Sequence, residues 1–165
     1  MNIIFQRTWE KVVLGDKTQT RRRIIEGDYL SGTGFAVLTK NGRGVYEVGK
    51  QYAVMPARGV KGLRKVADIE ITRIRREDVR EITESDAIAE GFYGDVEFWH
   101  TWVDMHDKSF YETFAYAADT DYLNEYGFFG RPDKYYDAWA LDFRVIAVYA
   151  DAIEIARELL RKVTS

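Results

Sequence analysis

A short segment near the start of the chain, residues 15–23 (GDKTQTRRR), carries the side chains best suited to chemistry. A threonine hydroxyl is a weak nucleophile alone, but a nearby lysine whose pKa is lowered by burial can take its proton. Lys17 and Thr20 would form such a pair, and Arg22 would hold an oxygen-rich substrate through two parallel hydrogen bonds. On a regular strand Lys17 and Thr20 point to opposite faces, so they converge only if the backbone turns or bulges. Spacing alone favours the alternative, a solvent-exposed basic strand.

Glu90 is a second candidate for chemistry. It lies near the end of a short expected helix, where an acidic side chain opposes the helix dipole. Such a conflict with local preference is sometimes a functional signature, and in other cases the acid is simply solvent-exposed. Glu90 could pair with Lys17 or orient a substrate amine, although the sequence alone does not bring the two together.

The sequence predicts neither a tight metal site nor a cofactor. His100 and His106, with Asp104 and Asp107 nearby, do not have the i, i+4 spacing of a helical metal pair, so we expect surface or packing histidines. The chain has no cysteine, which excludes a disulfide scaffold and a thiolate zinc site. It also contains no Walker-type loop, no dinucleotide-binding glycine motif and no nucleophile elbow.

Charge is distributed unevenly along the chain. Residues 1–80 contain 17 Lys and Arg against 9 Asp and Glu, whereas residues 81–165 contain 7 against 18. This asymmetry fits a basic face for an anionic partner, and it fits equally well two opposite faces of one solvated domain. The basic clusters at 21–23, 61–65 and 73–76, with interleaved aromatics, could bind a nucleic-acid backbone and stack bases, or could simply form a solvated surface. A pI near 5.5 argues against strong non-specific binding to long duplexes.

The elements that must position these residues follow from hydrophobic periodicity and turn signals. The length of 165 residues and the 46% hydrophobic content indicate one domain with a real core. The patterns predict strands at 3–5, 51–55, 66–75 and 139–147, and helices at 7–14, from the Thr83 N-cap to Gly91, around 98–105 and at 150–163. Residues 26–44 are expected to form a loop or loose hairpin, and residues 119–136 an irregular aromatic lid or arm.

The start of the chain lacks the basic and apolar regions of a signal peptide. No apolar run approaches the roughly 20 residues that a membrane-spanning helix needs. We therefore expect a cytoplasmic protein with no membrane partner.

The segment around Lys17 resembles the signature of the ASCH domain, G-x-K-x-x-E-x-R. Gly15, Lys17 and Arg22 match it, and Thr20 stands where many members have Glu. One ASCH branch, the small bacterial N4-acetylcytidine amidohydrolases, also has Thr at this position. The resemblance to that branch extends to the stretches at 5–7 and 82–90 and to the closing strand at 139–143.

In those amidohydrolases a lysine, a threonine and a glutamate form the catalytic set. The resemblance therefore implies that Lys17 is the general base, Thr20 the nucleophile and Glu90 the third member. It also implies a group of residues that bind substrate or RNA, namely Gln6, Arg7, Arg21, Arg22 and Arg23.

The ASCH domain is a relative of the PUA RNA-binding fold, so the resemblance also implies an architecture. We expect an α+β fold with a PUA-like small β-barrel of about five to six strands, flanked by helices. An ASCH/PUA-like domain would span residues 1–149, with a loop insertion at 26–48 and an aromatic, helical insertion at 93–136. A C-terminal helix would follow at 150–165.

Two classes of function remain open. The protein could bind a modified nucleoside in a pocket around Lys17, Thr20 and Arg22 and hydrolyse the amide of an N4-acetylcytidine-like substrate. Alternatively, it could be a non-catalytic RNA-binding module or an ASCH-type ribonuclease. An enzyme would have a small closed pocket, whereas an RNA binder would have an open basic groove. The sequence leaves the oligomeric state open.

Overall fold

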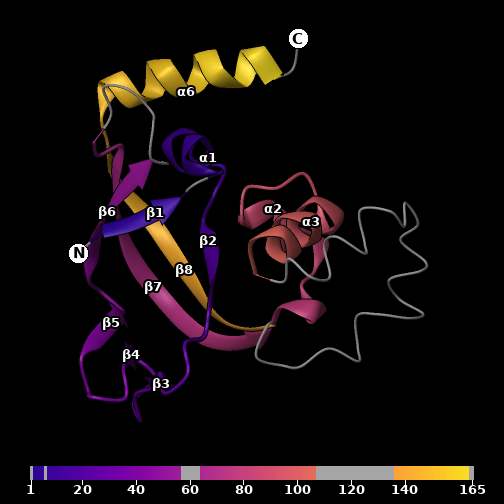
Figure 1. The fold of residues 1–165 in the computed structure, drawn as a ribbon. Coiled ribbons are helices and arrows are strands. Elements are labelled where there is room, and N and C mark those ends of the chain that lie inside the picture. The colour runs from indigo at the N-terminus through magenta and orange to yellow at the C-terminus, as the bar shows by residue number, and fades with distance from the viewer. Residues whose placement is uncertain (1, 6, 57–63, 107–135, 164–165) are drawn as a thin grey trace.

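The computed structural model describes residues 2–5, 7–56, 64–106 and 136–163. Within these residues the chain has a mixed α+β architecture with a five-stranded sheet, a three-stranded sheet and four α-helices (Figure 1). The α+β class expected from the sequence is confirmed.

The five-stranded sheet has the order β1-β6-β7-β8-β2. Its strands are β1 (Asn2–Phe5), β2 (Gln19–Arg23), β6 (Gln51–Pro56), β7 (Ala67–Asp78) and β8 (Asp137–Val148). β1 runs parallel to β6, and the other neighbours are antiparallel. The strands predicted at 3–5, 51–55, 66–75 and 139–147 are thus all confirmed, and the basic segment after Lys17 does enter the sheet.

The two long strands β7 and β8 form the centre of this sheet, and both curve strongly along their length (Figure 1). Ile69 and Ile71 on β7 are fully buried, whereas Glu70 between them is only partly buried. This alternation is what the sequence predicts for a strand with one face on the core. Irregularities in the pairing between Asp68 and Arg73 interrupt the ladder, and such bulges bend a strand.

A small antiparallel sheet occupies the segment that the sequence predicts as a loop insertion at 26–48. It consists of β3 (Tyr29–Leu30), β4 (Ala36–Leu38) and β5 (Gly44–Glu47). Val37 of β4 is fully buried in the main hydrophobic core. The segment therefore contributes to the core of the domain.

The prediction of a closed β-barrel is wrong. In the described residues the strands form two separate sheets, and β1 and β2 are the two edges of the larger one. The curvature brings these edges towards each other, but the hydrogen bond that joins them is made by a side chain: Arg22 Nη2 on β2 donates to the carbonyl oxygen of Ile4 on β1 at 2.8 Å. Side chains thus lie between β1 and β2, where a closed barrel would have a ladder of backbone hydrogen bonds.

Helices α1 (Trp9–Leu14) and α6 (Ala150–Val163) pack against each other beside one end of the large sheet (Figure 1). Trp9, Val12 and Val13 of α1 are buried, as their predicted helical spacing requires. α1 ends at Gly15, whose left-handed φ of 85° is the expected C-terminal signal. This turn redirects the chain into β2.

Helices α2 (Glu84–Ala89) and α3 (Asp95–His106) lie on the other side of β2 and have a core of their own. A 3₁₀ turn, η1 (Val79–Glu81), leads into them from β7. The predicted N-cap is confirmed, because Thr83 accepts a hydrogen bond from the backbone N–H of Asp86 at 3.2 Å. The second core contains Val79, Ala87, Phe98, Trp102, Val103, Tyr136 and Ala138.

The lid or arm predicted at 119–136 lies almost entirely outside the described residues. No helix in the part of the chain that the structure describes has the length and apolar character needed to cross a membrane.

Gly91 fixes how α2 approaches α1, and this generates a prediction about stability. Its φ is 90°, and a Cβ atom at this position would lie 3.2 Å from Lys11 Cβ and 3.4 Å from Thr8 Cβ. The Gly91→Ala substitution should therefore lower the free energy of unfolding by about 1–2 kcal/mol or more.

Chemical denaturation would measure this loss. Gly94→Ala is the matched control, since its Cβ would meet no atom within 4 Å and its φ is not positive. Equal stability of the two variants would contradict the proposed steric role of Gly91.

Candidate active site

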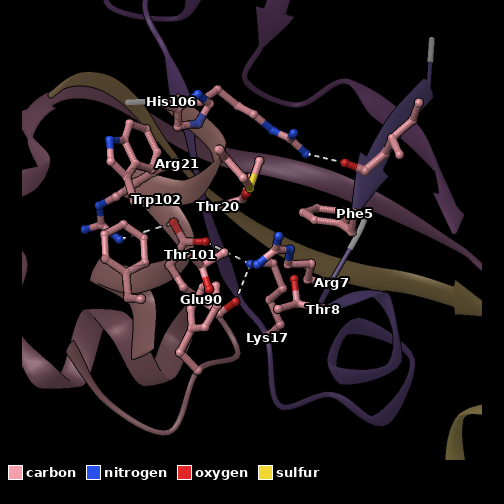
Figure 2. Close-up of a pocket in the computed structure, with 15 residues that line it drawn as sticks. Phe5, Arg7, Thr8, Lys17, Thr20, Arg21, Glu90, Thr101, Trp102 and His106 are labelled. Carbon is pink, nitrogen blue, oxygen red and sulfur yellow. Dashed lines mark hydrogen bonds and ion pairs between the residues drawn. The ribbon is translucent and has the colours of Figure 1, made fainter. Parts of the chain in front are cut away.

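A cavity of about 250 Å³ lies where the edges β1 and β2 face each other and α3 approaches them (Figure 2). Each of these elements contributes side chains to its wall. The lining residues are Ile4, Phe5, Arg7, Thr8, Lys17, Thr20, Arg21, Arg22, Glu90, Phe92, Phe98, Thr101, Trp102, Met105 and His106.

Lys17 enters the cavity wall because the backbone turns before β2 begins. After Gly15 the backbone N–H of Lys17 donates to the carbonyl of Lys11 at 3.1 Å, which folds the chain back onto α1. The N–H of Thr18 donates to the carbonyl of Ala89 at 2.8 Å, which ties the segment to the end of α2. Lys17 thus lies outside the strand, so the alternation of side chains along β2 does not separate it from Thr20.

The Lys17 ammonium is paired with Glu90. Lys17 is 1% exposed and Glu90 is 3% exposed. Lys17 Nζ donates to Glu90 Oε2 at 2.8 Å and also to the backbone carbonyl of Glu90. Burial lowers the pKa of Lys17 below the ordinary value of a lysine, and the Glu90 carboxylate opposes this shift only in part.

Glu90 is the C-cap residue of α2, so it lies at the helix end where a negative charge opposes the helix dipole. Its carboxylate does not face solvent. One oxygen accepts from Lys17, and the other accepts from Arg21 Nη1 at 3.4 Å. Two cations therefore outweigh the repulsion between the carboxylate and the helix dipole.

Arg21 connects this pair to further charges on the sheet. Its Nε and Nη2 donate to Glu77 Oε2 at 3.0 and 2.6 Å. Glu77 also accepts from Arg75, whose Nη1 donates to Asp142 Oδ1 at 2.6 Å. Arg21, predicted as a substrate-binding residue, is thus held in a network of carboxylates and has contacts suited to positioning Glu90.

Thr20 also lines the cavity and is 4% exposed. It pairs with Leu141 of β8, which fixes the position of its backbone. Among the described residues no hydrogen bond joins its hydroxyl to Lys17 or Glu90. The structure therefore places Lys17, Thr20 and Glu90 around the same cavity, and in the described residues the hydrogen bond among these three side chains joins Lys17 to Glu90 (Figure 2).

Phe5 lies between two cations of the cavity. Its ring centroid is 5.2 Å from Lys17 Nζ and 5.3 Å from Arg22 Cζ, distances suited to cation–π attraction. Arg22 reaches across to Ile4 through Nη2, whereas its buried Nε has no hydrogen-bond partner in the described residues. Arg22 thus presents an unsatisfied donor beside the cavity.

The other predicted binding residues differ in position. Arg7 lines the cavity and forms an ion pair with Asp104 of α3. Arg23 is exposed and is not part of the cavity wall. Gln6 lies outside the described residues.

Sequence reasoning missed the wall formed by α3. Phe98, Thr101, Trp102, Met105 and His106 all line the cavity. Their spacing of three and four residues places them on one helical face, which was the available signal. Burial and the positive charges of Arg23 and Arg22 lower the pKa of His106 to about 4, so its imidazole is neutral near pH 7.

Among the described residues no group of three or more His, Asp or Glu side chains is arranged to hold a metal ion. What the cavity does offer is a buried amine of lowered pKa, a nearby hydroxyl, a carboxylate and a guanidinium. This set is suited to proton transfer and nucleophilic attack on a small polar substrate.

Comparison with known proteins supports the fold. The chain matches no protein-family model and no curated protein. It is similar to the crystal structure of protein EF3133 from Enterococcus faecalis V583, of the family DUF984, with a TM-score of 0.51 and 19% identity over 88% of this chain and 73% of that one. It also matches an ASCH domain from Lactobacillus crispatus JV V101 with a TM-score of 0.45 and 20% identity, over 82% of this chain and 68% of that one. At these identities the likeness concerns the fold alone.

The Lys17–Glu90 pair generates a prediction about the charge of the lysine. Because the Glu90 carboxylate favours the protonated amine, Glu90→Gln should lower the pKa of Lys17 further. An NMR titration of the Lys17 side chain would measure the shift.

Glu77→Gln is the matched control. It removes one carboxylate charge that pairs with Arg21, as Glu90→Gln does, but Glu77 is not a partner of Lys17. In this control the pKa of Lys17 should stay closer to its value in the unaltered protein than it does in Glu90→Gln. A Lys17 pKa that rises in Glu90→Gln would contradict the pairing.

Proposed function

We propose that the protein is an ASCH-type amidohydrolase acting on an acylated nucleoside such as N4-acetylcytidine. The observation that carries the proposal is the buried Lys17 amine, paired with Glu90 on the wall of a cavity that Thr20 also lines. The match of Gly15, Lys17, Thr20 and Arg22 to the amidohydrolase form of the ASCH signature supports it.

In the proposed reaction Thr20 Oγ1 attacks the carbonyl carbon of the acyl group, and its proton passes to Lys17 Nζ. The bond between that carbon and the exocyclic nitrogen of cytosine then breaks. Lys17 returns the proton to the departing nitrogen, which leaves cytidine and an acyl ester on Thr20. Water, deprotonated by Lys17, then attacks the ester carbon, the bond from that carbon to Thr20 Oγ1 breaks, and Lys17 returns the proton to Thr20 Oγ1 as the carboxylic acid leaves.

Lys17 must be neutral when it accepts the proton of Thr20. The lowered pKa of Lys17 increases the fraction of neutral amine near pH 7. Glu90 orients the amine through Oε2, and Arg22 would stabilise the negative charge that develops on the carbonyl oxygen.

The size of the cavity also supports a small substrate. At about 250 Å³ it lies below the roughly 300–1,000 Å³ typical of sites for drug-sized ligands. Its aromatic side chains, including Phe92, Phe98 and Trp102, suit a planar base.

An RNA-binding role without hydrolysis is the second candidate. Arg22 and Arg23 have no carboxylate partner in the part of the chain described by the structure, so their charge is available to a phosphate. Binding of short single-stranded RNA that weakens with salt and with Arg23→Ala, without any nucleoside hydrolysis, would favour this candidate.

The amidohydrolase proposal predicts that Thr20→Ala abolishes release of cytidine from N4-acetylcytidine, followed by chromatography of the products. Thr18→Ala is the matched control, because Thr18 is exposed and lies outside the cavity wall. Lys17→Met should reduce the rate by about 10²–10⁴-fold through loss of the base. Turnover that is unchanged in Thr20→Ala would refute the assigned nucleophile.

The pH dependence of the reaction follows from the same lysine. Only neutral Lys17 accepts a proton, so kcat/KM should rise with pH and level off above the pKa of Lys17. Because burial lowers that pKa, the midpoint should lie below the ordinary titration range of lysine. A rate that falls as pH rises through this region would argue against Lys17 as the base.

A further inference from the structure

The C-terminal end of α3 brings His106 into the cavity on the side away from the Lys17–Glu90 pair. Figure 2 shows Lys17 and Glu90 close together and His106 at the opposite end of the lining residues. In the proposed reaction the bond that breaks lies beside Lys17. The part of the substrate near His106 is therefore a part that does not react, and its contacts contribute binding energy.

His106 has the chemistry of a recognition group. Its ring packs against Trp102 with centroids 4.4 Å apart, and Trp102 is itself stacked on Phe98 at 5.8 Å. These contacts restrict the orientation of the imidazole. In the described residues neither ring nitrogen of His106 has a hydrogen-bond partner, so both remain available to a ligand.

The charge around His106 determines which ligand groups it suits. Burial, together with the positive charges of Arg23 and Arg22, keeps the imidazole neutral. A neutral imidazole has one N–H donor and one acceptor nitrogen. It therefore pairs with uncharged polar groups, and a ring carbonyl is the natural partner of its N–H.

We propose that His106 is a specificity-determining residue that donates a hydrogen bond to the ring carbonyl of a pyrimidine base, while Trp102 positions it. This inference rests on the proposed function for the placement of the base. The acylated amino group and the ring carbonyl of cytosine lie at the two ends of one edge. When this edge of the base lies along the cavity, the acylated amino group is beside Lys17 and the ring carbonyl is beside His106.

The test measures binding of the reaction products, so it does not depend on turnover. Calorimetric titrations at pH 7.5 would compare cytidine and free cytosine on the unaltered protein, His106→Phe and His106→Gln. His106→Phe keeps a flat ring but has no donor, and it should weaken both ligands roughly tenfold. His106→Gln restores an N–H donor and should recover much of the affinity.

His100→Ala is the matched control, because His100 lies on the same helix, is exposed and does not line the cavity. It should leave both affinities unchanged, and unfolding midpoints would verify that each variant is folded. The inference is overturned if neither ligand binds, if His106→Phe binds both normally, or if it weakens cytidine alone, which would assign the contact to the ribose. Absence of N4-acetylcytidine hydrolysis, with His106-dependent binding intact, would refute the proposed reaction and leave the recognition role standing.

Discussion

The buried ion pair between Lys17 and Glu90 is the interaction on which the arrangement of this protein depends. It joins two segments that are 73 residues apart, the turn before β2 and the end of α2. Both side chains are almost fully removed from water, so removal of the Glu90 carboxylate would leave the buried charge of Lys17 uncompensated. The pair therefore holds the helical layer of α2 and α3 against the edge of the sheet, and this contact forms the cavity.

The same charges continue through the sheet as an alternating series. From Lys17 the order is Glu90, Arg21, Glu77, Arg75 and Asp142, with each residue next to a partner of opposite sign. Formal charge balances along the series. Side-chain exposure rises from a few per cent for Lys17, Glu90 and Arg21 to between 21 and 26% for the last three residues. The free-energy cost of removing these charges from water is therefore smaller towards the end of the network.

Local features of the fold were predictable from the sequence, because they depend on neighbouring residues. The alternation along β7, the helical spacing in α1, the Thr83 cap and the turn at Gly15 all follow from short-range periodicity and backbone preference. The open edges of the sheet were not predictable in this way. Whether β1 and β2 form a ladder depends on the curvature of β7 and β8 and on the side chains of Phe5 and Arg22, which lie between the edges.

The candidate site was predictable only in its composition. Lys17, Thr20 and Glu90 were recognisable through their resemblance to an enzyme family, and Glu90 also conflicted with the helix dipole. Their convergence depends on contacts over long distances in sequence, which no local pattern encodes. His106 was missed as a lining residue because it was judged together with His100 by metal spacing, whereas the decisive pattern was the face of α3 on which His106 packs against Trp102.

Lys17 must satisfy two opposing requirements if it acts as a base. Protonated, it compensates the charge of Glu90, and neutral, it can accept a proton. Loss of its charge would leave the buried Glu90 carboxylate alone if lysine were its only partner. Arg21 removes this conflict, because its guanidinium keeps its charge at any relevant pH and lies 3.4 Å from the second oxygen of Glu90. Arg21 can therefore stabilise Glu90 in both protonation states of Lys17, which makes the proton of Lys17 exchangeable without disrupting the fold.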